Sequence, residues 1–253
     1  MKNDSKQIHI PGILGGMGPH AHIILEEHLL EINAKKSNAI QYRDHPVWIT
    51  ISATDIPDRT ESIKSNPDDC ISKLIQYCKK LEQAGADFIL IPCNTSHAFF
   101  PAVQKEIKTP IFNLMEITSK YISQKFPEAR NVGILATDGT IYTQLYQKSL
   151  IARNLKPIDF VSSPDLQSLV MESIYSANWG IKATGEKVSA KALEALKKAM
   201  DHLILQDCDL IISGCTEISV ANSQAGLSGK YPIIDPINIV AEEAIKYIYG
   251  YGD

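Results

Sequence analysis

Short apolar runs alternate with longer amphipathic stretches along the whole chain. The apolar runs predict strands over His9–Leu14, Val47–Ser52, Phe88–Ile91, Val132–Leu135, Ile158–Val161 and Leu210–Ser213. The amphipathic stretches predict helices over His20–Ala34, Pro67–Ala84, Phe99–Lys105, Met115–Lys125, Tyr142–Arg153, Asp165–Ser176, Ser189–Gln206 and Asn238–Gly250. Such alternation is typical of parallel sheets with helices on both faces. The pattern therefore predicts an α/β fold, in which ligands bind beyond the carboxyl ends of the strands.

The pattern also repeats once along the chain. Leu74–Leu90 aligns without gaps on Leu196–Ile212, and Gly12–Pro19 aligns on Gly133–Thr140 at almost the same separation. The repeat carries two cysteines, one in Ile-Leu-Ile-Pro-Cys-Asn-Thr and the other in Ile-Ile-Ser-Gly-Cys-Thr-Glu; they are Cys93 and Cys215. Repeats of this kind indicate a duplicated structural unit. We therefore expect two pseudo-symmetric domains, with the active site in the cleft between them.

The halves lack a Gly/Ser/Pro-rich linker, which favours two domains in close contact. We expect an N-terminal α/β domain over residues 1–115 and a second α/β domain over residues 116–228. Residues 229–253, with the last predicted helix, are expected to complete the N-terminal domain.

Composition narrows the classes of function. The 253 residues are 44% hydrophobic and 21% charged, which is ordinary for a soluble globular protein. A net charge of −4 without a long basic run argues against nucleic-acid binding. The polar start of the chain lacks the apolar segment of a signal peptide, and no apolar run is long enough to span a bilayer. Five cysteines, an odd number, argue against a disulfide framework and for a reducing, cytoplasmic location.

A metal site is not expected, because no C-x-x-C motif is present and the histidines are scattered. Cys70, Cys78 and Cys208 fall on predicted helices or just before a strand, where buried and inert cysteines are common. Cys93 and Cys215 differ because both follow a strand, at the point where a helix is expected to begin. A helix N-terminus lowers the pKa of a thiol.

Matched thiols from matched domains suit one kind of reaction. Inverting a stereocentre by proton transfer needs a base on one face of a carbon and an acid on the other, and the roles exchange with reaction direction. Thr95 and Thr216 follow the two cysteines and are expected to cap the helices there. A nicotinamide cofactor is not expected, because the turn Gly15-Gly16-Met17-Gly18 does not fit G-x-G-x-x-G.

Several motifs, in order, resemble the aspartate/glutamate racemase family, and aspartate racemases most closely. They are Gly-Gly-Met-Gly-Pro at residues 15–19, Ile-Pro-Asp-Arg-Thr at 56–60, Pro-Cys-Asn-Thr-Ser-His at 92–97, Gly-Ile-Lys-Ala at 180–183 and Gly-Cys-Thr-Glu at 214–217. The resemblance implies a homodimeric isomerase that works without pyridoxal phosphate or another cofactor on a small amino-acid substrate. It also implies that the last helix packs back on the first domain.

The resemblance assigns a role to each candidate residue. Cys93 and Cys215 would be the two proton donor/acceptors. The substrate's carboxylate and amino group would be held by Asn94, Thr95, Ser96 and Thr216, and Met17 would approach the substrate with its backbone. Arg59 and Lys182 would receive an acidic side chain, which makes L-/D-aspartate the expected substrate.

Plainer interpretations remain for some of these residues. The glycine-rich turn could be only a tight turn, Arg59 a solvated ion pair with its acidic neighbours, and Lys182 a surface residue. His97 and Glu217 are more typical of helix faces than of acid/base groups. Glutamate or a broad range of amino acids is the alternative substrate. A maleate isomerase or hydantoin racemase relative, and a non-catalytic amino-acid-binding protein, are the alternative functions.

Overall fold

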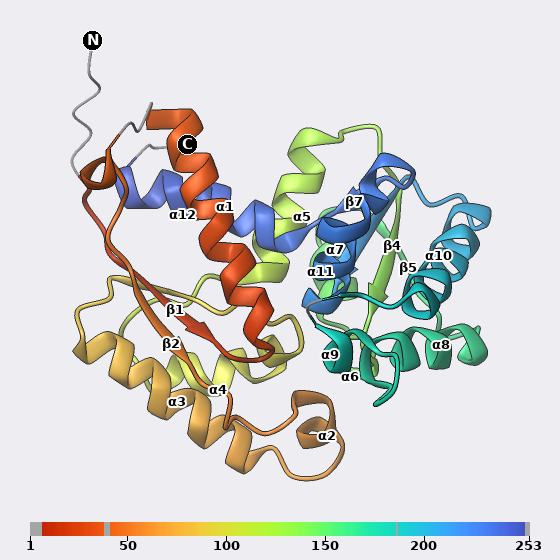
Figure 1. Ribbon diagram of the computed structural model, residues 1–253, viewed down its shortest axis with the longest axis horizontal. Helices are drawn as coiled ribbons and strands as arrows, with labels where there is room; N and C mark the ends of the chain where they lie inside the picture. The colour runs from red at the N-terminus through yellow and green to blue at the C-terminus, as the bar shows by residue number, and fades with distance from the viewer. Residues whose placement is uncertain (1–6, 38–40, 186, 251–253) are drawn as a thin grey trace.

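Two parallel sheets, each flanked by helices, form the protein in a computed structural model that describes residues 7–37, 41–185 and 187–250 (Figure 1). The first sheet has the order β2-β1-β3, with β1 at Pro11–Gly15, β2 at Ile49–Ser52 and β3 at Phe88–Leu90. Around it lie α1 (Pro19–Ser37), α2 (Arg59–Lys64), α3 (Asp68–Gln83), α4 (Phe100–Lys105) and α5 (Leu114–Lys125). The predicted α/β class is confirmed.

The second sheet repeats this order with one more strand, as β5-β4-β6-β7. Its strands are β4 (Asn131–Ala136), β5 (Lys156–Ile158), β6 (Leu210–Gly214) and β7 (Ile233–Ile234). Its helices are α6 (Asp138–Tyr142), α7 (Leu145–Ile151), α8 (Pro164–Tyr175), α9 (Ile181–Thr184), α10 (Ala190–Leu205) and α11 (Thr216–Ala225). The final helix is α12, at Pro236–Tyr249.

The two sheets also have equivalent individual hydrogen bonds and residue pairings. Asp87 Oδ2 accepts from Ile10 N, just before β1, at 2.7 Å, and Asp209 Oδ2 accepts from Asn131 N, at the start of β4, at 2.9 Å. Ile89 pairs with Ile111 as an isolated parallel bridge, where Ile211 and Ile233 pair as β6 and β7. The sequence repeat is therefore a repeat of structure.

The helices that precede β3 and β6 bury the same positions of the repeat. On α3 the buried face has a three-to-four-residue spacing, as an amphipathic helix requires. Each of its buried residues has a counterpart at the corresponding position of α10; the pairs are Cys70 and Ala192, Leu74 and Leu196, Cys78 and Met200, and Leu81 and Leu203.

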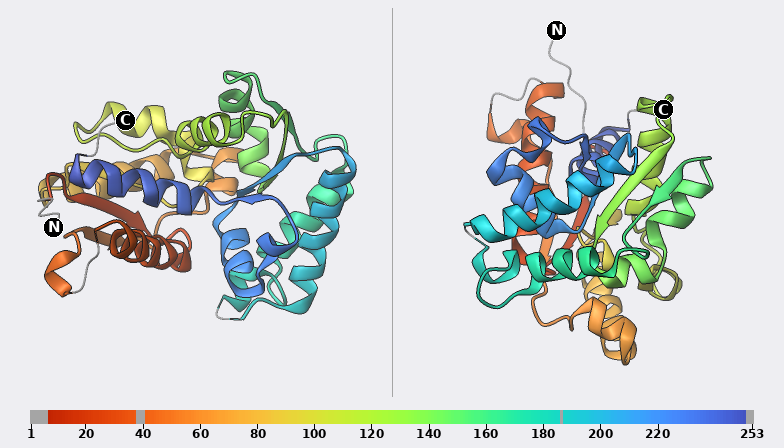
Figure 2. Two further views of the ribbon diagram at one scale, coloured as in Figure 1. Left: turned by 90° about the horizontal axis from the view of Figure 1, so that it is seen from above. Right: turned by 90° about the vertical axis from the view of Figure 1, so that its right-hand side faces the viewer.

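The last helix returns to the first half of the molecule. α12 packs against α1 and α5, and Figure 2 shows it beside the N-terminal sheet. Asp235 caps its N-terminus by accepting from Ile237 N at 3.0 Å, as Asn113 caps α5 by accepting from Met115 N at 3.1 Å. The exact division at residues 115/116 and 228/229 stays a prediction, and the ends of those ranges include residues outside the described ones.

Some predicted elements are wrong in their limits. The strand expected at Ile158–Val161 lies earlier, because Asp159 Oδ1 accepts from Val161 N and turns the chain after Ile158. The helix expected over Tyr142–Arg153 is divided between α6 and α7, because Gln144 has a left-handed φ of 56°. Among the residues that the structure describes, no helix is long and apolar enough to cross a membrane.

Candidate active site

Cys93 and Cys215 lie at the carboxyl ends of equivalent strands and line one cavity. Cys93 follows β3 and Cys215 follows β6, and the two side chains are 5% and 6% exposed. The cavity is narrow: about 260 Å³ of space lies between its atoms, which come from both halves of the molecule, and part of that space is open to solvent. Its other lining residues are Met17, Arg59, Asn94, Thr95, Thr137, Tyr175, Lys182, Thr216 and Glu217. Both cysteines thus line a space between the two halves, where the site was expected.

The glycine turn after β1 forms one wall of the site. Gly16 has a φ of 94°, and a Cβ there would lie 2.5 Å from the backbone of Ala53, so only glycine fits. His22 supports the turn, because its Nδ1 accepts from Gly16 N at 3.4 Å. The carbonyl of Met17 accepts from Arg59 Nη2 at 3.2 Å. The backbone of Met17 therefore orients a cation in the site.

Arg59 is the first residue of α2 and is buried, with 7% exposure, so it is not a solvated surface ion pair. Its Nη1 donates to the carbonyls of Ile56 and Pro57 at 3.3 and 3.0 Å. Its Nε is buried and has no hydrogen-bond acceptor among the described residues. Burial lowers the pKa of Arg59, but the charge of Cys93, together with Asp58, raises it overall.

Asn94 is fixed by a side chain from the other half of the molecule. The hydroxyl of Tyr146, on α7, donates to Asn94 Oδ1, which sets the orientation of the amide. Asn94 Nδ2 is then left buried without an acceptor in the described part of the chain. Two buried donors, Nε of Arg59 and Nδ2 of Asn94, thus belong to residues that line the same cavity.

The residues after Asn94 hold the Cys93 loop in place. Thr95 Oγ1 lies 3.0 Å from the hydroxyls of Thr137 and Thr140, across the domain boundary. Ser96 Oγ donates to the Cys93 carbonyl at 2.7 Å, and His97 Nδ1 lies 2.9 Å from the same oxygen. Burial lowers the pKa of His97. Thr95 lines the cavity, whereas the polar atoms of Ser96 and His97 are directed to backbone atoms.

The second cysteine has a different partner. Cys215 Sγ donates to Glu217 Oε2 at 2.9 Å, and Thr216 Oγ1 donates to the same oxygen at 3.2 Å. Burial and the neighbouring Glu217 carboxylate raise the pKa of Cys215 well above its ordinary value. Cys215 is the N-cap residue of α11, and Asn94 that of the 3-10 helix Thr95–Phe99. The expected capping by Thr95 and Thr216 is wrong, because their hydroxyls bond to side chains instead.

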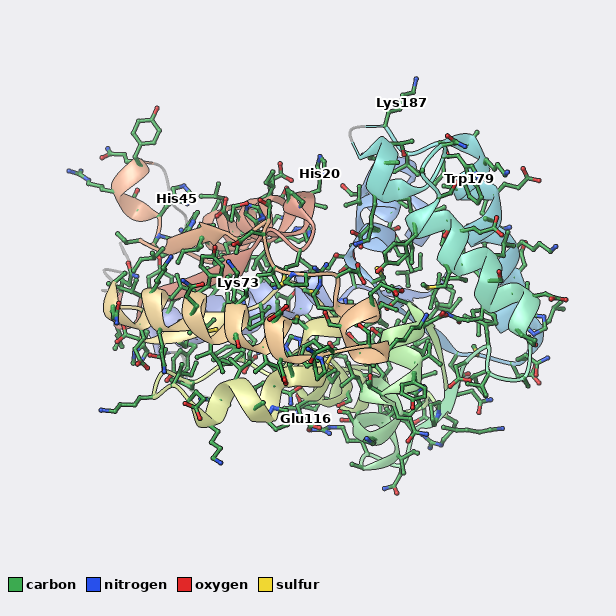
Figure 3. The ribbon with its side chains drawn as sticks, turned by 90° about the horizontal axis from the view of Figure 1, so that it is seen from below. His20, His45, Lys73, Glu116, Trp179 and Lys187 are labelled. Carbon is green, nitrogen blue, oxygen red and sulfur yellow. The ribbon has the colours of Figure 1, made fainter. Side chains whose placement is uncertain are left out.

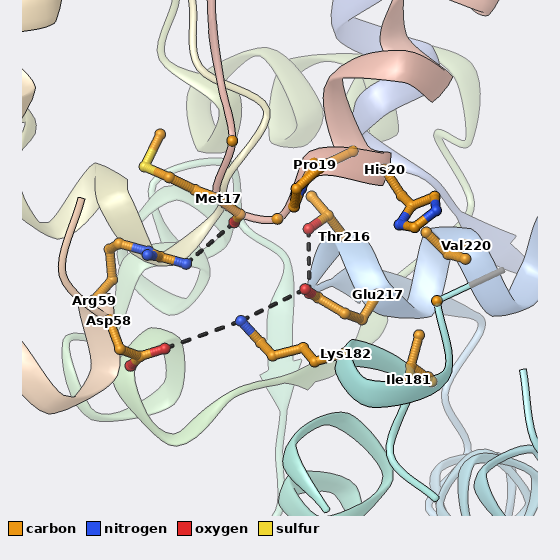
Figure 4. Close-up of a pocket in the computed structure, with 14 residues that line it drawn as sticks. Met17, Pro19, His20, Asp58, Arg59, Ile181, Lys182, Thr216, Glu217 and Val220 are labelled. Carbon is orange, nitrogen blue, oxygen red and sulfur yellow. Dashed lines mark hydrogen bonds and ion pairs between the residues drawn. The ribbon is translucent and has the colours of Figure 1, made fainter. Parts of the chain in front are cut away.

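Lys182 joins two carboxylates, as Figure 4 shows. Its Nζ lies 3.5 Å from Glu217 Oε1, 3.9 Å from Asp58 Oδ2, and 4.6 Å from the ring centre of Tyr175. Burial lowers the pKa of Lys182, but Glu217 and Cys215 raise it overall. Tyr175 also donates to Asp58 Oδ2 at 3.1 Å. Lys182, with a side chain 27% exposed, is thus part of an ion-pair network that spans both halves.

A wider pocket adjoins the cavity of the thiols and shares Met17, Arg59, Lys182, Thr216 and Glu217 with it. It encloses about 730 Å³ of space, part of which is open to solvent. Apolar side chains from α1, α9 and α11 add to its wall; they include Ala21, Ile181 and Val220. His20 of α1 also lines it, and Figure 3 shows His20 on the side of its domain that faces Lys187 and Trp179.

The remaining cysteines are buried, as predicted. Cys70 and Cys78 are fully buried and Cys208 is 7% exposed. Burial raises the pKa of Cys70 and Cys208 to about 11 and that of Cys78 to about 12. All five cysteines are free thiols. In the described ranges no group of three or more His, Cys, Asp or Glu residues is arranged to hold a metal ion.

Sequence reasoning missed some residues of the site. Asp58 and Glu217 stand inside recognised motifs, yet their position beside Lys182 is visible only in the structure. Thr137 occupies the position in the repeat that Gly16 holds in the first half, so the repeat was a usable signal for it. No sequence pattern identified Tyr175 as a site residue, because it reaches the site from the end of α8.

Comparison with known proteins shows to which family this chain belongs. The Asp/Glu/hydantoin racemase family matches residues 14–244, which is most of the chain. The chain belongs to this family. The predicted resemblance and the predicted class of enzyme, an amino-acid racemase and so an isomerase, are confirmed by this match.

Named relatives differ in substrate. A broad-specificity amino-acid racemase of Bacillus subtilis is 26% identical over 95% of this chain and 98% of the relative. A glutamate racemase of Carboxydothermus hydrogenoformans is 27% identical over 68% of this chain and 59% of that relative. The Picrophilus torridus aspartate racemase structure matches with a TM-score of 0.76 and 25% identity, covering 96% of this chain and 95% of that one.

Proposed function

We propose that this racemase inverts the α-carbon of an amino acid by a two-base mechanism in which Cys93 and Cys215 exchange roles. One thiolate removes the α-proton from one face, while the opposite thiol donates a proton to the other face. Because the two residues come from matching positions of a duplicated fold and line one cavity, the substrate would lie between them. The chain's own residues then carry out every proton transfer, and no cofactor takes part in the proposal.

The unpaired donors in the cavity are the observation that carries this proposal. A buried N–H without an acceptor costs about 1–3 kcal/mol, so such groups point to an absent ligand. Arg59 Nε and Asn94 Nδ2 are both in this state and both belong to residues that line the cavity of the thiols. A carboxylate accepts from both kinds of donor. The α-carboxylate would therefore bind Asn94, with the backbone of the Cys93 loop and Thr216 around it.

Aspartate is the substrate we favour. Its side-chain carboxylate would reach Arg59, which is buried and has an unused donor, with Lys182 as a second cation. Arginine suits this task because its planar guanidinium binds carboxylates in a two-point manner. Glutamate would place its carboxylate one methylene further into the adjoining pocket.

One observation favours broad specificity as a second candidate. Lys182 is already paired with Glu217 and Asp58, so the four charged groups beside the thiols, Arg59 included, sum to zero. A neutral side chain would enter such a site without leaving an unpaired charge. The adjoining pocket, with Ile181 and Val220 in its wall, offers apolar surface for longer side chains.

A direct assay tests the proposal and separates the substrates. Purified protein is incubated with single L-amino acids, acidic, neutral and basic, without pyridoxal phosphate, and the D-form is measured by chiral chromatography. We expect aspartate to racemise fastest, and Cys208→Ala, a change of a structural cysteine, to keep that activity. Equal rates with neutral amino acids would establish broad specificity. Racemisation of no amino acid tested would overturn the proposal.

The assembly and the compartment are parts of the same proposal. A homodimer is implied by the family resemblance, and light scattering of the purified protein would test it. A cytoplasmic location is supported by the five free thiols, since reduced cysteines persist in reducing compartments.

A further inference from the structure

The two halves of the repeat differ at the second residue after each cysteine. The second residue after Cys93 is Thr95, whose hydroxyl contacts Thr137 and Thr140 rather than the thiol. The second residue after Cys215 is Glu217, whose carboxylate accepts the hydrogen of the thiol at 2.9 Å. Among the described residues, one thiol therefore has an anionic hydrogen-bond acceptor that its counterpart lacks.

The other charges in the site reinforce this difference. Arg59 and Cys93 line the same cavity, and the charge of the thiol is among the causes that raise the pKa of Arg59. Around Glu217, Lys182 of α9 lies 3.5 Å away, and Asp58 of the loop before α2 reaches only the far side of that lysine. Each thiol thus has a cation nearby, Arg59 for Cys93 and Lys182 for Cys215, but in the described part of the chain only Cys215 also bonds to a carboxylate.

We propose that Glu217 is a positioning residue that disfavours the Cys215 thiolate in the substrate-free enzyme, so that the form with a Cys93 thiolate and a Cys215 thiol predominates over the reverse form. This inference rests on the two-thiol mechanism proposed above. A thiolate at Cys215 would stand against the Glu217 carboxylate, and like charges at this distance disfavour each other in a buried site. A thiolate at Cys93 would instead stand beside Arg59.

Glu217 affects how the enzyme returns to its starting protonation state after each turnover. In the first half of a cycle the Cys93 thiolate takes the α-proton, and the Cys215 S–H bond breaks as its proton joins the opposite face of the carbon. The enzyme is left with a Cys93 thiol and a Cys215 thiolate beside Glu217. One proton must then pass from Cys93 to Cys215 before the same enantiomer can react again. Glu217 favours this return, because it makes the Cys215 thiolate the less stable of the two forms.

Alkylation of the free enzyme tests the inference without using racemase activity. Iodoacetamide reacts with thiolates, and the rate at each cysteine is followed by peptide mass spectrometry from pH 6 to 10. We expect Cys93 to react at least about tenfold faster than Cys215 at pH 7.5 in the unmodified chain. In Glu217→Gln, which keeps the shape but removes the charge, the rate at Cys215 should rise about tenfold or more, a shift of about one pH unit in its profile.

Two controls make this result specific. Asp58→Asn removes the same charge from the other partner of Lys182, and asparagine still caps α2, so the profile of Cys215 should move much less than in Glu217→Gln. Cys70, Cys78 and Cys208 are reference thiols within the same chain, and faster alkylation there would reveal loosening of the fold.

An unchanged pH profile of Cys215 in Glu217→Gln, with the reference cysteines also unchanged, would overturn the inference. So would an unmodified enzyme in which Cys215 reacts faster than Cys93. Increased alkylation of the reference cysteines in Glu217→Gln would call for the same measurement in Glu217→Asp, which keeps the charge; slow alkylation of Cys215 there supports the inference, and fast alkylation contradicts it. Failure of the proposed function would instead appear as no racemisation with the thiol profiles as predicted.

Discussion

Two cations that the sequence presents as equals have different surroundings in the structure. Arg59 is held by three backbone carbonyls and retains an unused Nε, whereas Lys182 is paired with Glu217 and Asp58. A substrate carboxylate can bind Arg59 without breaking an ion pair. At Lys182 it must compete with two carboxylates. We therefore propose Arg59 as the main determinant of any preference for an acidic side chain.

This difference predicts unequal effects of the two alanine variants. Arg59→Ala removes a charge-assisted contact of about 1.5–3 kcal/mol, so kcat/KM for aspartate should fall about ten- to a hundredfold. Lys182→Ala should lower it less, and both proteins should remain folded by circular dichroism. Kinetics with aspartate and alanine in each variant check this. If aspartate kinetics stay unchanged in both variants, the acidic side chain binds elsewhere.

Part of this residue-scale picture was predictable from sequence. The repeat and the motifs marked Cys93, Asn94, Arg59 and Lys182, all of which line the cavity. The pairing of Cys215 with Glu217 was not predictable, because it depends on side-chain conformations in the first turn of α11. The pairing of Tyr146 with Asn94 was not predictable either, because it depends on how side chains from separate elements meet. The second pair joins two halves of the molecule whose relative position no local pattern encodes.

At the scale of elements, the hydrophobic pattern predicted the long helices and most strands well. α3 and α10 show why: their buried faces repeat with helical spacing and belong to the repeat. Short elements were missed or shifted because side-chain and backbone details decide them. Asp159 turns the chain at the end of β5, and α2 begins where Asp58 caps it by accepting from Thr60 N at 2.9 Å.

Equivalent substitutions in α3 and α10 should lower the free energy of unfolding by similar amounts. Leu74 and Leu196 occupy the same position of the repeat and are 1% and 0% exposed. Leu→Ala at either position creates a cavity and should lower the free energy of unfolding by about 2–5 kcal/mol. Chemical denaturation of the two variants, with exposed Lys79→Ala as the control, measures this. Costs below 1 kcal/mol at one site would show that its helix is not part of an equivalent core.

At the scale of the whole molecule, hydrogen bonds across the boundary hold the two halves around the site. Tyr146 to Asn94, Thr95 to Thr137, and Tyr175 to Asp58 each join residues from different halves. Gly139 of α6 permits this close approach, since a Cβ there would lie 2.7 Å from Thr95 Cγ2. The sequence predicted that the halves touch, whereas these contacts define how they touch.

Buried histidines should make the molecule sensitive to mild acid. Burial lowers the pKa of His97 and of His22 below the ordinary value of 6.5. Below that value the unfolded chain takes up protons that the folded chain does not, so stability should fall as the pH decreases from about 6.5. Urea midpoints at pH 7.5 and 5.0 measure this, and His97→Asn should reduce the fall, whereas His20→Gln, at an exposed position, should not. An equal fall in all three proteins would contradict the assignment to His97.

The central claim, that one thiol serves each face of the substrate, is tested most directly by α-proton exchange in heavy water. Cys93→Ser and Cys215→Ser nearly preserve side-chain shape but remove one acidic group each. Neither variant should racemise its substrate. Any remaining exchange of the α-proton, followed by NMR, should favour one enantiomer in Cys93→Ser and the opposite enantiomer in Cys215→Ser. Near-normal racemisation of both enantiomers by Cys93→Ser would contradict the two-thiol mechanism and leave the repeat a purely structural feature.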